Sequence, residues 1–232
     1  MTRLPTEKAQ RLRVRFARRA EAGSVGHLEM ARCWAHALDA ASIAVSHTEG
    51  HRQQPRLTIA AGLPVGVTSE GELFDVILAQ HLHPAELAAR VHDHLPPGLD
   101  VLDVREVGVG LPALPTSVRW ADYSVDLPTT TDARAAVEAL LAADTLRWED
   151  TRGKKVRRYD LRPLVQDITV ERCADVTRLI MRLRCDASGV GRADQVAKAL
   201  CLPEPLRVHR LRLVLSEPSP ARDAWRRRGR FA

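Results

Sequence analysis

The spacing of apolar residues in the first 110 positions changes repeatedly between the periods of strands and helices. Residues 8–16 read KAQRLRVRF, in which apolar and basic residues alternate. A period of two predicts a strand with one apolar face and one basic face. The basic face of this predicted strand carries Arg11, Arg13 and Arg15.

Two amphipathic helices and three further strands follow in this half. Residues 25–44 place Leu28, Trp34 and Leu38 at helical spacing, and Pro84 stands where a second helix tolerates proline, in its first turn. The predicted strands span residues 56–61, 70–79 and 99–107. The order is therefore β-α-β-β-α-β.

A second, similar series begins after residues 108–116, GVGLPALPT, whose glycines and prolines predict a linker. The predicted elements are a strand at 117–127, a helix at 129–143, a hairpin from 145–149 and 155–160, strands at 166–171 and 176–185, a helix at 192–201 and a strand at 206–215. This is again close to β-α-β-β-α-β, with insertions in the middle.

These patterns predict an α+β protein of two tandem ferredoxin-like halves with antiparallel sheets. We expect the first domain at residues 1–110, the second, with insertions, at 111–221, and a basic, flexible tail at 222–232. In each half, two helices would cover one face of the sheet and leave the other face free to bind a partner.

The net charge of +6 is unevenly distributed along the 232 residues. Residues 1–110 contain 12 basic and 13 acidic residues, whereas residues 222–232 contain five arginines and one aspartate. Because much of the excess lies in the tail, the overall charge gives little support to nucleic-acid binding by the folded part.

Several classes of protein are excluded or disfavoured by the composition. No run of about 18 apolar residues or secretory signal is visible, so we expect a cytoplasmic protein without a membrane span. The four cysteines form no CxxC pair, and the histidines lack the spacing of a metal site. We therefore expect neither a metal nor a cofactor.

Three segments carry a distinctive pattern: GHLEMARCWAHAL at 26–38, EGHRQQPRLTIAAGLPVGVTSEGELFDV at 49–76, and YDLRPLV at 159–165. They resemble a bacterial domain-of-unknown-function family known as radical SAM-linked or radical SAM-associated proteins. The chain departs from the family pattern at Gly26, where serine is usual, and at His51–Gln54, where the family has a Phe-Asn-Pro-His run. These departures argue against a strict active site in that loop.

The resemblance implies a partnership with a separately encoded radical SAM enzyme. This chain has no Cys-x3-Cys-x2-Cys motif, so it cannot hold the iron–sulfur cluster of such an enzyme alone. The tandem fold is also similar to that of CRISPR repeat-processing RNA endonucleases, although fold alone does not determine function.

Arginines on strands are the best candidates for binding RNA phosphates. Arg178, Arg182 and Arg184 repeat the pattern of the first strand, and His27, Arg56 and Arg162 match motifs of the family. Each of these side chains has a structural alternative: pairing with acids on neighbouring strands, capping a helix or fixing a loop.

The sequence therefore predicts a non-catalytic RNA-binding or substrate-presenting module that works with a radical SAM enzyme, in tRNA or rRNA modification. One alternative is a metal-independent RNA endonuclease with His27 as general acid or base. Another is a protein-interaction adaptor that binds no nucleic acid.

Overall fold

The computed structural model describes residues 4–152 and 155–216, along which strands and helices follow the predicted order. The elements of the first half are β1 (Gln10–Arg18), the 3-10 helix η1 (Ala20–Ala22), α1 (His27–Ala40), β2 (Leu57–Ile59), β3 (Thr68–Leu78), α2 (Pro84–His92) and β4 (Leu99–Val107).

The second half begins with a short helix in the predicted linker. Its elements are α3 (Leu114–Ser117), β5 (Val118–Pro128), α4 (Arg134–Ala142), β6 (Arg147–Arg152), β7 (Lys155–Asp160), the 3-10 helix η2 (Arg162–Leu164), β8 (Val165–Arg172), β9 (Val176–Asp186), β10 (Gly189–Val190), α5 (Ala193–Ala199) and β11 (Arg207–Leu215). The predicted basic tail, residues 222–232, lies outside the described residues.

Local chemistry explains where two of the helices begin. The imidazole Nδ1 of His83 accepts a hydrogen bond from the backbone N–H of Ala85 at 3.3 Å, which caps α2 just before Pro84. Helix α4 begins five residues later than predicted, at Arg134. The Thr177 hydroxyl donates to the carbonyl oxygen of Thr131 at 3.0 Å, so this segment joins β9 instead of starting the helix.

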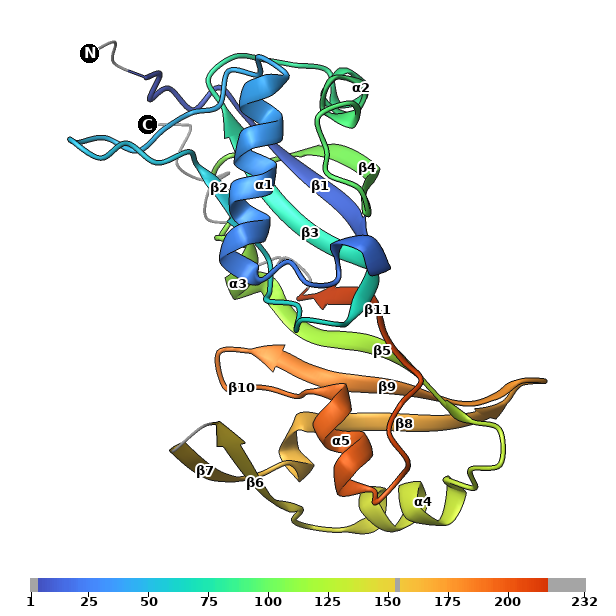
Figure 1. The fold of residues 1–232 in the computed structure, drawn as a ribbon. Coiled ribbons are helices and arrows are strands. Elements are labelled where there is room, and N and C mark those ends of the chain that lie inside the picture. The colour runs from blue at the N-terminus through green and yellow to red at the C-terminus, as the bar shows by residue number, and fades with distance from the viewer. Residues whose placement is uncertain (1–3, 153–154, 217–232) are drawn as a thin grey trace, which may run out of the picture.

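Nine strands form one mixed sheet, in which nearly all neighbours are antiparallel. In the first half the strand order is β2-β3-β1-β4, and in the second half it is β8-β9-β5-β11. The two sets are not separate sheets, because β11 pairs with β5 on one side and with β3 on the other. Figure 1 shows the two halves meeting at this point.

The junction between the halves depends on a short parallel contact and a glycine. His209 and Arg210 of β11 pair with Thr68 and Ser69 of β3. Beyond this contact β11 passes so close to Gly71 that a Cβ there would lie 2.3 Å from the carbonyl oxygen of Leu211. Only glycine allows this approach of two backbones.

Each half has its own hydrophobic core under its helices. In the first half, Phe16, Trp34 and Phe74 bring β1, α1 and β3 together, with ring centroids 4.5–5.8 Å apart. The second core includes Val137 of α4 and Val196 of α5 against the apolar face of β5 and β9. The helices therefore leave the other face of β5 and β9 to polar side chains.

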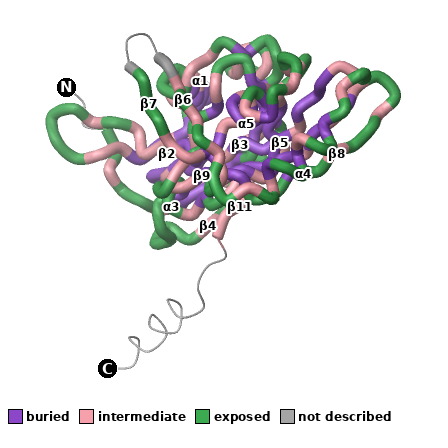
Figure 2. Tube along the Cα trace, turned by 90° about the horizontal axis from the view of Figure 1, so that it is seen from below, coloured by how far each residue is buried: buried purple, intermediate pink, exposed green. Residues whose placement is uncertain are grey.

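The β6–β7 hairpin forms a small sheet of its own. Figure 2 shows exposed residues along this hairpin, whereas β3 and β5 run through the buried middle of the molecule. None of the helices within residues 4–152 and 155–216 is long and apolar enough to cross a membrane.

Candidate functional site

The three arginines of β1 have different environments. Arg11 and Arg13 are buried, and both donate to Asp75 of β3, with Nε–Oδ distances of 2.9 and 2.7 Å. Arg11 also donates to the carbonyl oxygen of Leu111 at 2.8 Å, which fixes the segment between the two halves. Arg15 is exposed, and no carboxylate in the described part of the chain lies within 4.0 Å of it.

Burial limits what Arg11 and Arg13 can do. The carboxylate of Asp75 pairs with both guanidinium groups. The three side chains together therefore carry one net positive charge beneath the surface. Their hydrogen bonds hold β1 to β3 and to the linker, and a ligand would reach Arg15 far more easily than either arginine. Of the predicted phosphate ligands on β1, only Arg15 presents its side chain to solvent.

The arginines of β9 share one strand face, as the sequence predicts, and two of them lie over buried aspartates. Buried and half-buried residues alternate along the whole strand. Arg178 donates from Nε to Asp126 at 2.6 Å, and Arg182 donates from Nε to Asp122 at 2.7 Å. Arg184 stacks on the indole ring of Trp120, with 4.9 Å between its guanidinium carbon and the ring centroid.

Asp122 is the most heavily used of these carboxylates. Burial alone would raise its pKa, but hydrogen bonds from Arg182 and Arg212 outweigh burial and lower the pKa below its ordinary value. The distance from Arg212 Nε to Asp122 Oδ2 is 2.8 Å. The carboxylate is therefore ionised at neutral pH and joins β5, β9 and β11. The charge of Arg182 is therefore neutralised by Asp122 within the protein.

The remaining predicted residues are spread over the molecule. His27 is exposed as the first residue of α1, and Arg56 donates to the carbonyl oxygen of His47 at 3.1 Å. Arg162 donates to the carbonyl oxygens of Leu141 and Ala143 at 2.9 and 3.1 Å. Since these carbonyls end α4, Arg162 caps the C-terminus of that helix.

A second buried arginine cluster is absent from the sequence predictions. Arg18, Glu72 and Arg210 are each no more than 2% exposed. Arg210 donates from Nε to Glu72 Oε1 at 2.7 Å and from Nη2 to Glu72 Oε2. Arg18 donates to backbone oxygens instead, among them that of Val25 at 2.9 Å and that of Val67 at 3.0 Å. The cluster joins β1, β3 and β11 to the loop that ends at Val67.

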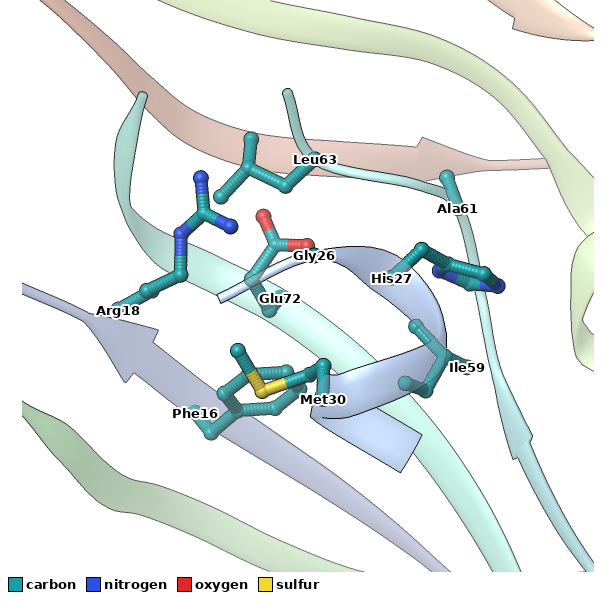
Figure 3. Close-up of a pocket in the computed structure, with 9 residues that line it drawn as sticks. All are labelled: Phe16, Arg18, Gly26, His27, Met30, Ile59, Ala61, Leu63 and Glu72. Atoms are coloured by element: carbon teal, nitrogen blue, oxygen red, sulfur yellow. The ribbon is translucent and has the colours of Figure 1, made fainter. Parts of the chain in front are cut away.

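A cavity of about 10 Å³ lies beside this cluster and beneath the start of α1. Figure 3 shows the imidazole of His27 on one side of it and the guanidinium of Arg18 on the other, with Glu72 between them. A space of this size holds about one water molecule. The cavity is too small to admit a nucleotide. Arg18 and Glu72 therefore stabilise the fold instead of binding such a ligand.

Two larger grooves open at the junction of the halves. One, of about 470 Å³, is lined by Arg15, Arg19, Arg207 and His209, together with Thr68 and Glu70 and neighbouring residues. The other, of about 410 Å³, is lined by Arg13, Arg15, Leu73, Asp103, Arg105, Leu213 and Leu215. Arg15 lines both, so the two grooves adjoin at this side chain.

The grooves bring together three exposed arginines that have no acidic partner. Within the described ranges, no carboxylate lies within 4.0 Å of Arg15, Arg105 or Arg207, and all three side chains are exposed. Arg207 Nη2 contacts the imidazole of His209 at 3.1 Å, but no carboxylate neutralises any of the three guanidinium groups, so each can donate to a phosphate or carboxylate ligand. Residues 4–152 and 155–216 contain no cluster of three or more His, Cys, Asp or Glu side chains arranged to hold a metal ion.

Sequence reasoning missed Arg105 and Arg207, although the signal was present. Both lie in strands that mix basic and apolar residues, LDVREV in β4 and RVHRLRL in β11. What the sequence does not contain is the pairing that brings β4, β1 and β11 to one junction.

The sequence model of one protein family, described as "Uncharacterized protein conserved in bacteria (DUF2344)", matches residues 11–192. No curated protein matches the chain. A solved structure titled "Crystal Structure of a Cbf5-Nop10-Gar1 Complex" aligns with 87% of this chain at 8% identity and a TM-score of 0.44. The chain covers 48% of that structure's chain, about half its length.

Proposed function

The chain belongs to this bacterial family, DUF2344, and on that premise we propose that it is a non-catalytic RNA-binding module. It would hold an RNA substrate at the junction grooves and present it to a separate radical SAM enzyme in the cytoplasm. The radical SAM partner is supported by the resemblance of residues 26–38, 49–76 and 159–165 to radical SAM-associated proteins.

A single observation carries the RNA proposal. Three exposed arginines from three strands, Arg15, Arg105 and Arg207, line two adjoining grooves and have no carboxylate partner within 4.0 Å among the described residues. By contrast, the buried Arg13 and the β9 residues Arg178 and Arg182 are matched with aspartates at 2.6–2.7 Å. Guanidinium groups beside a groove that have no carboxylate partner favour a ligand with several phosphates.

The grooves favour contact with the backbone of RNA rather than recognition of its bases. Arginine provides a planar fork of N–H donors that fits phosphate oxygens. The residues lining the two grooves include no Phe, Tyr or Trp on which a base could stack. We therefore expect binding with a strong dependence on salt and little dependence on sequence.

We also infer that both halves are ferredoxin-like. The strand orders β2-β3-β1-β4 and β8-β9-β5-β11 support this assignment, since each places the first strand of its half beside the third and fourth. In this interpretation the grooves lie where two such units share a sheet edge through β3 and β11.

The test is RNA binding by the full chain across a salt series, measured by fluorescence anisotropy with a short labelled RNA. A variant with Arg15→Gln, Arg105→Gln and Arg207→Gln is compared with the wild type. The matched control replaces three exposed arginines away from the grooves, Arg32, Arg134 and Arg172, so that the same net charge is removed.

The groove variant is expected to bind more weakly, with a slope of log affinity against log salt that is reduced by about 2 for a single strand. The control variant should keep most of the wild-type slope. Equal losses in the two variants would mean that general charge, not the grooves, drives binding. A third variant separates the contribution of the tail by replacing its five arginines, Arg222, Arg226, Arg227, Arg228 and Arg230, with glutamine.

A further inference from the structure

The imidazole of His209 lies in the larger groove and bridges its two walls. His209 belongs to β11 and pairs in register with Thr68 of β3. Its Nδ1 lies 2.7 Å from the Thr68 hydroxyl and 3.1 Å from Nη2 of Arg207. Its Nε2 faces Glu70, with 3.9 Å between Nε2 and Oε2. Both edges of the ring are therefore close to groups that line the groove.

These contacts require a neutral imidazole in the free protein. A guanidinium N–H can only donate, so the Nδ1 atom that faces Arg207 must be an acceptor. The Thr68 hydroxyl can donate to the same atom. The remaining proton then sits on Nε2, toward Glu70. The ring is therefore uncharged, and its Nδ1 lone pair accepts hydrogen bonds from Thr68 and Arg207.

Charged groups from every adjoining element act on this ring. Burial and Arg207 lower the pKa of His209 below its ordinary value, against Glu70 and Glu72 of β3 and Asp126 of β5, which act to raise it. The same groove is lined by Arg15 of β1, Arg19 and Glu21. The cations on the groove wall outnumber the carboxylates, so the groove attracts an anion. A bound anion would favour the charged form of the imidazole.

We propose that the groove beside His209 is a phosphate-binding subsite, in which the imidazole takes up a proton and becomes a charged ligand of the phosphate. This inference rests on the proposed function, since the phosphate is that of the bound RNA. A phosphate oxygen accepts hydrogen bonds from Arg207 and from the new Nδ1–H of His209. The Thr68 hydroxyl no longer donates to Nδ1 and instead exchanges hydrogen bonds with water. No covalent bond forms or breaks, and the proton comes from solvent.

Proton uptake on binding makes the affinity depend on pH. The free imidazole titrates below its ordinary pKa, and a neighbouring anion raises that pKa in the complex. Between the two values, affinity increases as pH falls, by up to about tenfold per pH unit for one proton. Thr68 and Arg207 oppose this proton uptake at neutral pH, because their hydrogen bonds to Nδ1 favour the neutral ring.

The experiment follows the titration of His209 by NMR in the full chain, labelled at its nine histidines. The probe is sulfate, a dianion that does not itself titrate in this range, compared with chloride at equal ionic strength. His209→Gln identifies the resonance. His51, which is exposed in the loop between α1 and β2 and lines neither groove, serves as the internal control.

Sulfate is expected to move the titration midpoint of His209 upward by about one pH unit and to leave that of His51 unchanged. In Arg207→Gln the midpoint in chloride should rise, because a neighbouring cation is lost, and the effect of sulfate should shrink. RNA affinity should rise several-fold more between pH 7.5 and pH 6 in the wild type than in His209→Gln.

A His209 midpoint that is the same in both salts would overturn the inference, and RNA binding that still depends on Arg15, Arg105 and Arg207 would leave the proposed function intact. A midpoint that moves in sulfate, in a protein that binds no RNA, would keep the anion site and overturn the proposed function. Equal movement at His51 would mean a general salt effect and would also overturn the subsite.

Discussion

The guanidinium of Arg210 lies against the carboxylate of Glu72, and both side chains are almost wholly buried, at 1% and 2% exposure. The two residues are separated by 138 positions and belong to different halves of the chain. Burial opposes the charge on Arg210, yet Glu72 and Tyr123 together raise its pKa above the ordinary value. The pair is therefore an ion pair that fastens β11 to β3 where the two cores meet.

Removing one partner of this pair should destabilise the fold strongly. Glu72→Gln leaves a buried guanidinium without its counter-ion, which costs about 3–5 kcal/mol. Urea denaturation followed by circular dichroism measures the loss. The double variant Glu72→Leu with Arg210→Met removes both charges and should be more stable than Glu72→Gln alone. A loss below about 1 kcal/mol in Glu72→Gln, as for a solvent-exposed pair, would contradict the buried pairing.

Gly71→Ala should destabilise the same junction by a different route. The added methyl group would lie 2.3 Å from the Leu211 carbonyl oxygen and 2.4 Å from the Arg212 Cα. Backbone on both sides cannot move away cheaply, so we expect a loss of about 1–3 kcal/mol in the free energy of unfolding. Gly62→Ala is the matched control, because its Cβ would meet only the His27 imidazole, at 3.9 Å. Equal stability of the two variants would argue against the close approach of β11 to β3.

The acid sensitivity of the second half should depend on Asp122. Arg182 and Arg212 lower its pKa in the folded protein despite its burial, so the ionised carboxylate stabilises the fold above its unfolded pKa of about 3.9. That stabilisation is lost as pH falls from there through the lower folded value. Asp122→Asn should be less stable than the wild type at pH 6, and the difference should shrink as pH approaches 3.

Chemical denaturation at half-unit pH steps measures this difference. Asp103→Asn, at an exposed position in β4, provides the control and should leave the pH profile parallel to that of the wild type. A difference between Asp122→Asn and wild type that stays constant from pH 6 to pH 3 would mean that the ionisation of Asp122 does not stabilise the fold.

The strands and helices could be predicted closely because each depends on local periodicity. The predicted strand at 99–107 coincides with β4, and the predicted hairpin contains β7 at 155–160. The joining of the strands into one sheet could not be predicted, because it depends on the two-residue pairing of β11 with β3. No periodic signal in either segment encodes that contact.

The candidate site was only partly visible in the sequence for a related reason. Alternation correctly puts Arg178 and Arg182 on one face of β9, but whether a guanidinium is free depends on the residue opposite it in the neighbouring strand. Likewise, Glu70 and Glu72 are expected on one face of a regular strand. The register of β1 and β3 shifts between Phe16 and Arg18, so Glu72 is buried against Arg210 while Glu70 lines the groove.

Paired and unpaired arginines should therefore respond differently to the same substitution. Arg178 donates at 2.6 Å to Asp126, which is 7% exposed, so Arg178→Gln deprives a buried carboxylate of a donor and costs about 1–2 kcal/mol of stability. Its effect on RNA affinity should be small. Arg15→Gln, at an exposed side chain, should change stability by less than about 0.5 kcal/mol and reduce the salt slope of RNA binding by about 0.7.

Measuring urea denaturation and RNA binding on both variants places each arginine in one of these two classes. The comparison is internally controlled, since each substitution removes one positive charge and replaces arginine with the same side chain. If Arg178→Gln weakened RNA binding as much as Arg15→Gln and left stability unchanged, its contact with Asp126 would be incidental. The RNA surface would then follow the arginine face of β9, and the junction grooves would lose their special role.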